Sequence, residues 1–349
     1  IAELLRLYKT VNAQTKADPA VLDTCRQELV KLQQGDPENM DIWTRCVALS
    51  LEQLRAIYAK LGIHFDHYLG ESAYNDKLAP LVEDLLAKGI AEISDGAVCV
   101  FFRDIEALAD KPCIIRKSDG GFLYATTDLA TIDHRIQEWQ ADEIWYVVGA
   151  PQELHFRQIF EVTRKRGQSV RLAHIAFGSI LGQDGKMFRT RSGESVGLIE
   201  VLDEAIERAA VVVAEREGFS EEEKTAIAET IGIGAVKYAE LSQNRLTDYK
   251  FSWDKMLSLQ GNTAPYLINA YVRTRAIFRK LGGDFTAPSA CVFTDPAERA
   301  LALKLAQFAE ATHDVLEDHR PNTLANYLYE LADTYHSFYE ACPVLRSEG

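Results

Sequence analysis

Three polar side chains stand near the ends of expected strands in the middle of the chain: a phenol, a carboxylate and an amide. Tyr124 ends one expected strand, and Asp128 opens the helix that follows it. Gln152 lies in the turn after the apolar run 144–148, with His155 just inside the next helix. Ligands of a parallel sheet bind beyond the carboxyl ends of its strands. Capping or loop solvation explains each residue alone, but together on one rim they predict a site for a small cationic molecule that carries an amine.

A structural role for Asp128 is the alternative that has to be weighed first. Thr127 is a candidate N-cap residue, and the helix dipole favours a carboxylate in the first turn. The same dipole would keep Asp128 charged, which also suits a cationic ligand. From these residues alone, both explanations stay open.

A glycine-rich segment with three cations directly follows an expected buried strand: GQDGKMFRTRSGESVGL, residues 182–198. Mobile glycine-rich loops with cations commonly hold phosphates while charge moves in phosphoryl or adenylyl transfer, so Lys186, Arg189 and Arg191 are candidates for that task. The segment is not a Walker loop, because the pattern G-x-x-x-x-G-K-[ST] is absent. An ordinary surface hairpin is the alternative.

Alternating strands and helices must position these residues. Segments 113–117, 122–125, 144–148 and 175–181 are expected strands, and a turn with hairpin chemistry separates the first two. Apolar residues at helical spacing occupy most of the remaining intervals, and 144–148 has the continuous hydrophobicity of a strand buried on both faces. This alternation predicts an α/β fold with a doubly wound parallel sheet.

Helical patterns flank this region. Residues 1–62 have helical spacing, and Pro80 is a plausible first residue of a helix that ends at Gly89, before an expected strand at 96–102. After about residue 198 only helical patterns remain, which predicts an all-α helical bundle. One packed face of its last helix is expected to comprise Leu324, Tyr327, Leu328, Leu331, Tyr335 and Phe338.

Composition limits the class of protein. The chain has 349 residues, 47% of them hydrophobic, which suffices for more than one core, and no apolar run approaches the roughly 18 residues of a membrane span. Six scattered cysteines without a C-x-x-C pair argue against a zinc ribbon or a disulfide framework. With no signal peptide, this usage predicts a cytoplasmic protein. Because the chain opens within a helical pattern and without Met, we expect it to be a fragment.

The net charge of −14 counts, as an average, against binding to nucleic acid. Basic residues nevertheless concentrate at 188–193 and 272–280, and a local basic face can bind phosphate on an acidic protein. Solvated loop and helix faces explain each concentration at least as well.

Six ordered segments resemble arginyl-tRNA synthetases of class I: FDHYLGES, SDGGFLYATTDLA, HFRQIF, LGQDGKMFRTRSGESVGL, GAVKYAELSQNR and LQGNTAPYLINAYVRTR. The resemblance extends over nearly the whole chain. It implies a Rossmann-like, nucleotide-binding catalytic domain at 1–235, with a helical insertion in roughly 1–100, and a truncated helical anticodon-binding domain at 236–349. It also implies arginine–tRNA ligase activity: arginine and ATP give arginyl-adenylate and pyrophosphate, and the arginyl group then passes to the 3′ terminal adenosine of its tRNA.

The resemblance assigns a pocket for arginine. Tyr124 and Asp128 match the tyrosine and aspartate of that pocket, and Glu71 matches a second acidic residue. Gln152 matches the glutamine that helps to hold the α-amino group of the substrate. A guanidinium has five donors in a planar fork, so two carboxylates and a phenol would distinguish it from the point charge of lysine. On this interpretation Asp128 binds the arginine side chain, and capping is secondary.

Further roles follow from the same resemblance. GKMFRTRSG is similar to a degenerate form of the K-M-S-K-S motif, so Lys186, or the arginines Arg189 and Arg191, would stabilise the triphosphate as pyrophosphate leaves. His155 and Gly178 join Lys186 in the implied ATP site, and Mg²⁺ accompanies ATP. Residues at the entry to the helical bundle would face tRNA, with salt-dependent phosphate contacts: Asn262, Tyr266, Arg273 and Arg275.

One departure keeps other functions open. The H-x-G-H motif of class I is absent, and HFDH at 64–67 lacks its glycine, so we expect the chain alone to be inactive. A catalytically dead paralogue or truncated form, acting as a tRNA- or protein-binding module, is a second hypothesis that the gene upstream of residue 1 would test. A third is another adenylating α/β ligase acting on a small acid, against which the helical half and the pair Glu71 and Asp128 count. The leading hypothesis implies a monomer that binds ATP, L-arginine and tRNA(Arg), with no metal site of its own and no membrane association.

Overall fold

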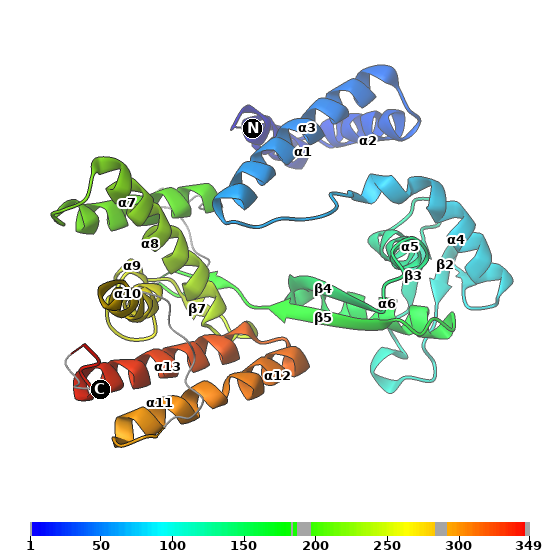
Figure 1. The fold of residues 1–349 in the computed structure, drawn as a ribbon. Coiled ribbons are helices and arrows are strands. Elements are labelled where there is room, and N and C mark those ends of the chain that lie inside the picture. The colour runs from blue at the N-terminus through cyan, green and yellow to red at the C-terminus, as the bar shows by residue number, and fades with distance from the viewer. Residues whose placement is uncertain (1, 183, 187–196, 283–291, 346–349) are drawn as a thin grey trace. The chain divides into compact units, whose positions relative to one another are not determined.

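A computed structural model describes residues 2–182, 184–186, 197–282 and 292–345 (Figure 1). Contacts between Cα atoms divide the chain into two units, residues 1–66 and residues 67–349, and each unit is described by itself. Among the described residues, no helix combines the length and the apolar character that a membrane crossing requires.

The first unit consists of three helices, as the helical spacing of residues 1–62 predicts: α1 (Ala2–Ala17), α2 (Pro19–Gln33) and α3 (Pro37–Lys60). Asp18 and Asp36 are the N-caps of α2 and α3, and each is followed by a proline at the first helical position. The carboxylates accept hydrogen bonds from backbone N–H groups of the first turn, which otherwise lack partners.

The second unit opens with alternating elements: η1 (Glu71–Tyr74), α4 (Asn75–Ala87), β1 (Glu92–Ser94), β2 (Ala97–Val100), η2 (Glu106–Leu108), β3 (Cys113–Arg116), α5 (Tyr124–Gln137), β4 (Glu143–Gly149), η3 (Ala150–Gln152), α6 (Glu153–Lys165), β5 (Arg171–Phe177) and β6 (Ile180–Leu181). β4 and β5 pair in parallel with α6 between them, which confirms the predicted strand–helix–strand alternation. β1, β2 and β3 instead form an antiparallel sheet.

Two expected boundaries in this region are wrong. Pro80 is not the first residue of α4 but lies inside it, since η1 leads directly into the helix at Asn75. The expected strand at 122–125 is reduced to a single bridge between Arg116 and Phe122, beyond the predicted hairpin turn. The chain then turns straight into α5.

The run 144–148 forms β4, but it is not buried on both faces. Ile144 and Tyr146 are buried, whereas Trp145 and Val147 are 50% and 65% exposed. Successive side chains of a strand point to opposite faces, so one face of β4 packs into the core and the other does not. The continuous hydrophobicity of the run concealed this alternation.

One core joins α4, the antiparallel sheet, α5, β4 and α6. Its fully buried side chains include Leu85, Phe102, Leu129 and Ile159. The free cysteine Cys113 of β3 belongs to this core, and Cys99 of the neighbouring strand β2 is also free and buried. Burial raises the pKa of the Cys113 thiol to about 12.

The rest of the second unit is almost entirely helical, as predicted: α7 (Leu198–Ala214), α8 (Glu221–Leu241), β7 (Tyr249–Lys250), α9 (Trp253–Met256), α10 (Ala264–Leu281), α11 (Pro296–Ala306), α12 (Phe308–Asp318) and α13 (Pro321–Ala341). The predicted face of α13 packs, with Tyr327 buried and the other five side chains half-buried. The sequence pattern missed β7, which pairs in parallel with β6.

Small residues allow α7 and α8 to pack closely. Ala205 and Ala209 of α7 are buried, as are Ala228 and Gly232 of α8. A Cβ atom added at Gly232 would lie 2.7 Å from the backbone nitrogen of Ile206 and 2.8 Å from the backbone of Ala205. Backbone atoms of a packed helix cannot rotate away, so the spacing of the two helices depends on this glycine.

We predict that Gly232→Ala destabilises the protein although alanine favours helices. The propensity gain is about 1 kcal/mol, whereas forcing extra volume into a packed interface typically costs about 1–3 kcal/mol. Gly234→Ala is the matched control two residues along the same helix, where an added Cβ meets nothing within 4 Å. Thermal unfolding should show a lowered Tm for Gly232→Ala and an unchanged or raised Tm for Gly234→Ala. Equal Tm values for the two variants would contradict the close approach.

Candidate active site

α5 presents Asp128 one turn inside the helix rather than at its start. The N-cap residue is Leu123, which is extended and contributes no side-chain hydrogen bond, and Tyr124 is the first helical residue. The predictions that Tyr124 ends a strand, that Thr127 caps the helix and that Asp128 opens it are therefore wrong. The polar residues of YATTD imitate a capping sequence, but the chain enters the helix four residues earlier.

Asp128 is bound by a histidine of the next helix. The Nε2 atom of His155 lies 2.6 Å from the Oδ2 atom of Asp128, and the two side chains are 26% and 28% exposed. Because a carboxylate oxygen only accepts, the Nε2 atom of His155 carries the proton. His155 stands in the first turn of α6, where the helix dipole favours a negative charge nearby. The pair thus holds a half-buried carboxylate at the amino end of α6.

A buried ion pair fixes the two helices that carry Asp128 and His155. Arg166, the C-cap residue of α6, donates from both Nη atoms to the two carboxylate oxygens of Asp133 in α5, at 2.9 and 2.8 Å. Gln168 donates to the same carboxylate at 2.7 Å. Bidentate arginine–carboxylate pairs restrict geometry as well as adding energy, so the register of α5 against α6 is tightly set.

Tyr146 is a buried phenol close to the Asp128 carboxylate. Tyr146 of β4 is buried, and its hydroxyl has no hydrogen-bond partner among the described residues. The guanidinium of Arg135 lies 5.3 Å from the centre of its ring. Burial raises the pKa of Tyr146; Arg135 opposes the shift, and the nearby Asp128 carboxylate adds to it. The phenol of Tyr146, close to the Asp128 carboxylate, therefore stays neutral.

The other predicted arginine-binding residues stand on α5 or on elements next to α5 and α6, and among the described residues none of them bonds to Asp128. Tyr124 precedes it by one helical turn and is 71% exposed. Gln152 is exposed in η3, three residues before His155, and Glu71 is exposed in η1, which packs against α5. Within the described part of the chain, a direct bond between predicted site residues joins only Asp128 and His155. That bond involves a residue predicted for ATP rather than for arginine.

The candidate phosphate loop is described only in part. Gly182 donates to the Lys186 carbonyl at 2.7 Å, and the Lys186 N–H donates to the Asp184 carboxylate at 3.1 Å, which forms a tight turn with Lys186 exposed. Arg189 and Arg191 lie outside the described residues. Gly178, predicted for ATP, has a different neighbour: a Cβ atom there would lie 2.8 Å from the backbone of Thr247.

The residues predicted to face tRNA divide into two groups. Asn262 donates to Asn326, the Tyr266 hydroxyl donates to Asp333, and Arg273 contacts the His336 ring nitrogen at 3.2 Å, so these three pack against α13. Burial, with the charge of Arg273, lowers the pKa of His336.

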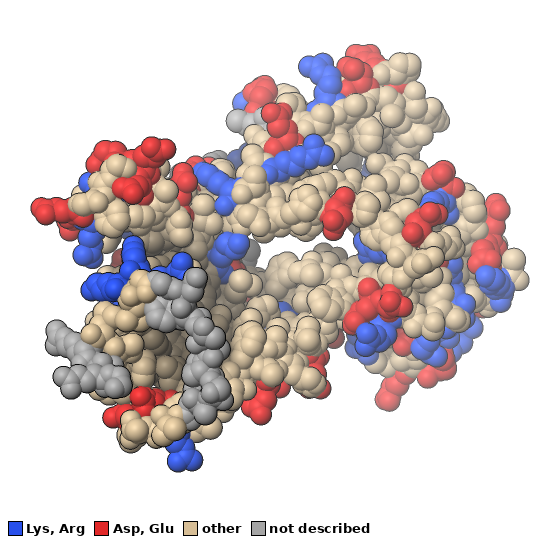
Figure 2. Space-filling model, in the orientation of Figure 1, with Lys and Arg blue, Asp and Glu red and all other residues tan. Residues whose placement is uncertain are grey.

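Arg275 differs from the other three. It is exposed on α10 and has no partner among the described residues, as is the case for Arg279 one turn later. Figure 2 shows Lys and Arg side chains gathered over the part of the surface where Figure 1 draws the end of α10.

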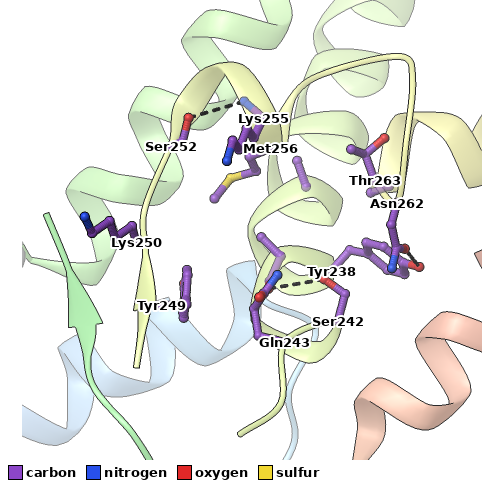
Figure 3. A pocket seen from close by; sticks show the side chains of 13 residues that line it. Tyr238, Ser242, Gln243, Tyr249, Lys250, Ser252, Lys255, Met256, Asn262 and Thr263 are labelled. Carbon is purple, nitrogen blue, oxygen red and sulfur yellow. Dashed lines mark hydrogen bonds between the residues drawn. The ribbon is translucent and has the colours of Figure 1, made fainter. Parts of the chain in front are cut away.

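Sequence reasoning missed a half-open cavity of about 290 Å³ between α8, β7, α9 and the start of α10 (Figure 3). Lys250 and Lys255 line it and have no ion-pair partner among the described residues. Tyr238 and Asn262 bond to each other on its rim, and burial raises the pKa of Tyr238 to about 12. No single motif indicates the cavity, because its lining comes from four elements.

Comparison with known proteins matches both halves of the chain. Residues 1–253 match the family model for tRNA synthetases class I (R), catalytic domain, and residues 267–349 match the model for the DALR anticodon binding domain. An arginine–tRNA ligase of Thermobifida fusca is 47% identical over 98% of this chain, and one of Laribacter hongkongensis is 45% identical over 100%. The chain spans 61% and 62% of the lengths of these relatives.

Solved structures agree. An arginyl-tRNA synthetase from Plasmodium falciparum, 28% identical, superposes with a TM-score of 0.80 over 96% of this chain and 58% of its own length. One from Thermus thermophilus, 23% identical, has the same fold, with a TM-score of 0.79 over 99% of this chain and 62% of its own. The chain therefore belongs to the arginyl-tRNA synthetase family, as a class I catalytic segment followed by a helical anticodon-binding segment.

Proposed function

We propose that this chain provides the second part of the catalytic domain, and the helical domain that follows it, of an arginine–tRNA ligase. The enzyme joins L-arginine to ATP as arginyl-adenylate and then transfers the arginyl group to the 3′ terminal adenosine of tRNA(Arg). The half-buried Asp128 carboxylate, held by His155 at the amino end of α6, is the observation that carries the proposal. In a family with this substrate, such a carboxylate fits the permanently charged guanidinium.

Recognition of arginine combines a fixed charge with exposed polar groups around it. His155 occupies one oxygen of Asp128 and leaves further acceptor positions for guanidinium N–H groups. Tyr124 and Glu71 would complete the side-chain pocket, and Gln152 would hold the α-amino group. Because these groups stand on α5, η1 and η3, the pocket requires the register that Arg166 and Asp133 maintain.

Adenylate formation needs a cation where negative charge leaves. A carboxylate oxygen of arginine attacks the α-phosphorus of ATP, and the bond to the β-phosphate bridging oxygen breaks as pyrophosphate departs. Lys186, in its exposed turn, is the described cation that would stabilise the departing charge, with Arg189 and Arg191 as further candidates. Mg²⁺ would arrive with the ATP phosphates, and roles of His155 and Gly178 in binding ATP stay predictions.

We infer that tRNA contacts the outer face of α10. Arg275 and Arg279 are exposed cations there; exposed Phe278 lies between them, and exposed Tyr271 precedes Arg275 by one turn of the same helix. The interleaving of arginines and aromatic side chains suits phosphates and unpaired bases. Asn262, Tyr266 and Arg273 would then act mainly by holding α10 against α13.

Several finer points remain proposals. A division of domains at residue 235 would fall within α8, which runs unbroken from 221 to 241. A cytoplasmic location is supported by the free state of the described cysteines. That the protein is a monomer stays a prediction.

The alternative of an inactive tRNA-binding module would be favoured if the complete gene product lacks H-x-G-H and shows no arginine-dependent pyrophosphate exchange.

We predict that Asp128→Asn in the complete gene product weakens the use of arginine severely. Asparagine keeps the shape but removes the charge opposite the guanidinium, and breaking a desolvated ion pair costs about 3–5 kcal/mol. This corresponds to roughly a hundredfold to several-thousand-fold loss in kcat/KM for arginine. Arginine-dependent pyrophosphate exchange measures it.

Asp133→Asn is the matched control on the same helix. It weakens the pair with Arg166 and so loosens the register of α5 against α6; it should lower the Tm more than Asp128→Asn does, and reduce kcat/KM for arginine by a much smaller factor. If Asp128→Asn lowered the Tm in the same way and left kcat/KM unchanged, Asp128 would have a structural role only.

We predict that two neighbouring arginines of α10 differ in their roles, one acting in tRNA binding and the other in stability. Arg275→Ala should weaken tRNA binding and reduce the slope of log Kd against log salt by about one, because one phosphate contact is lost, with an unchanged Tm. Arg273→Ala should lower the Tm, because Arg273 contacts His336 and lies 5.3 Å from the centre of the Tyr339 ring. Filter binding at several salt concentrations and thermal unfolding measure the two effects. An unchanged salt slope in Arg275→Ala would remove this face from the proposed interface.

A further inference from the structure

Residues 245–251, which we call the strap, run along residues 176–181 at the end of β5 and through β6. Gly178 donates to the Arg245 carbonyl at 2.7 Å, and Phe251 donates to the Leu181 carbonyl at 2.9 Å. Between these ends, β7 pairs with β6, and the Ser179 N–H donates to the Asp248 carboxylate at 2.6 Å. The strap is therefore bonded to this segment along its whole length.

The two backbones approach each other as closely as their atoms permit. At Gly178 an added Cβ would lie 2.8 Å from the carbonyl carbon of Thr247 and 2.9 Å from the Asp248 carboxylate. A glycine is needed wherever another backbone comes this near. The close approach at Gly178 and the hydrogen bonds along residues 178–181 therefore restrict movement of this segment relative to the strap.

The side chain of Arg245 extends this attachment to the helical half of the unit. Its guanidinium donates to three backbone carbonyls: Ala176 in β5, Asp318 at 3.2 Å and His319 at 2.8 Å. Asp318 ends α12, and His319 follows it in a left-handed conformation with φ 55° before α13 begins. The last carbonyls of a helix lack intrahelical donors, and a planar fork of five N–H groups suits several of them at once.

A second contact supports the same junction. The rings of Trp145 in β4 and His319 meet edge to face, with their centres 4.4 Å apart. The turn between α12 and α13 is therefore attached to the parallel strands by a guanidinium and by an aromatic contact. Only the guanidinium reaches β5 itself.

The attached segment leads directly into the turn that carries Lys186. β6 ends at Leu181, and the hydrogen bond from Gly182 to the Lys186 carbonyl begins the turn at the next residue. The base of that turn therefore takes its position from β6, and β6 takes its position from the strap. Arg245 is the side chain that ties this arrangement to the helical half.

We propose that Arg245 is a positioning residue for adenylate formation, which sets the place of Lys186 by clamping the end of β5 to the turn between α12 and α13. The proposal rests on the proposed function, in which Lys186 stabilises the triphosphate. Arg245 touches no substrate and acts through the strap. A cation displaced by about 1 Å can lose on the order of a hundredfold in rate, which makes the clamp visible in kcat.

A purely structural brace is the competing explanation, and the kinetic parameters separate the two. Arg245→Met in the complete gene product keeps an unbranched, though shorter, side chain and removes all the hydrogen-bond donors. We expect kcat of arginine-dependent pyrophosphate exchange to fall about tenfold to a hundredfold, with KM for arginine within about twofold of wild type. Arginine binds at Asp128 and Gln152, which stand on α5 and η3 and not on the strap. A brace alone would lower the Tm and leave kcat unchanged at temperatures where the variant is folded.

His319→Gly is the matched control. Glycine accepts the left-handed conformation of this residue and keeps the carbonyl to which Arg245 donates, while the ring that contacts Trp145 is lost. We expect kcat within about twofold of wild type. Arg245→Lys, which offers a single ammonium in place of the fork, should give an intermediate kcat.

Circular dichroism identifies the temperature range in which each variant is folded. If Arg245→Met does not fold, Asp248→Ala decides, because it removes an exposed bond of the strap and should lower kcat in the same direction by a smaller factor. A kcat within twofold of wild type in a folded Arg245→Met, or in Asp248→Ala when that variant decides, overturns the proposal. Absence of arginine-dependent exchange in the wild-type gene product overturns the proposed function, and the inference falls with it.

Discussion

The carboxylate of Asp133 accepts hydrogen bonds from both Nη atoms of Arg166. The alignment of α5 with α6 at the candidate site depends on this ion pair. The side chains are 17% and 8% exposed, so neither charge has enough water to replace its partner. With α5 and α6 held in register at this end, Asp128 and His155 meet at the other end. A residue on the substrate side therefore relies on a pair that no substrate reaches.

The helical half is attached to the strands by a different kind of contact. Arg245 binds backbone carbonyls, which exist whatever the side chains are, so the attachment depends on the paths of three chain segments and not on their sequence. At Gly178 the strap and the segment after β5 also meet backbone to backbone, and a glycine is required there because the neighbouring backbone leaves no room for a Cβ atom. The helical half and the strands thus meet through geometry that tolerates little displacement.

Much of this fold could be predicted because helical and strand periodicity arise between near neighbours in the sequence. The start of α5 was misplaced since Thr127 and Asp128 imitate a capping sequence, whereas the true N-cap, Leu123, contributes no side-chain bond. β7 has only two residues, and its segment bonds to residues 69 positions earlier, so no local pattern reveals it. Likewise, motifs indicated Asp128, but the bond from His155, 27 positions away, exists only in the folded chain.

Chemical modification of the buried cysteines in the antiparallel sheet would report local opening of that sheet. Burial raises the pKa of the Cys113 thiol to about 12, so the thiol stays protonated at neutral pH, and only the thiolate attacks alkylating reagents. Cys25, Cys46 and Cys342 are half-buried and accessible by comparison. Slow modification of Cys113 would therefore time the rare openings of the sheet between β2 and β3, in the unmodified sequence and without an introduced probe.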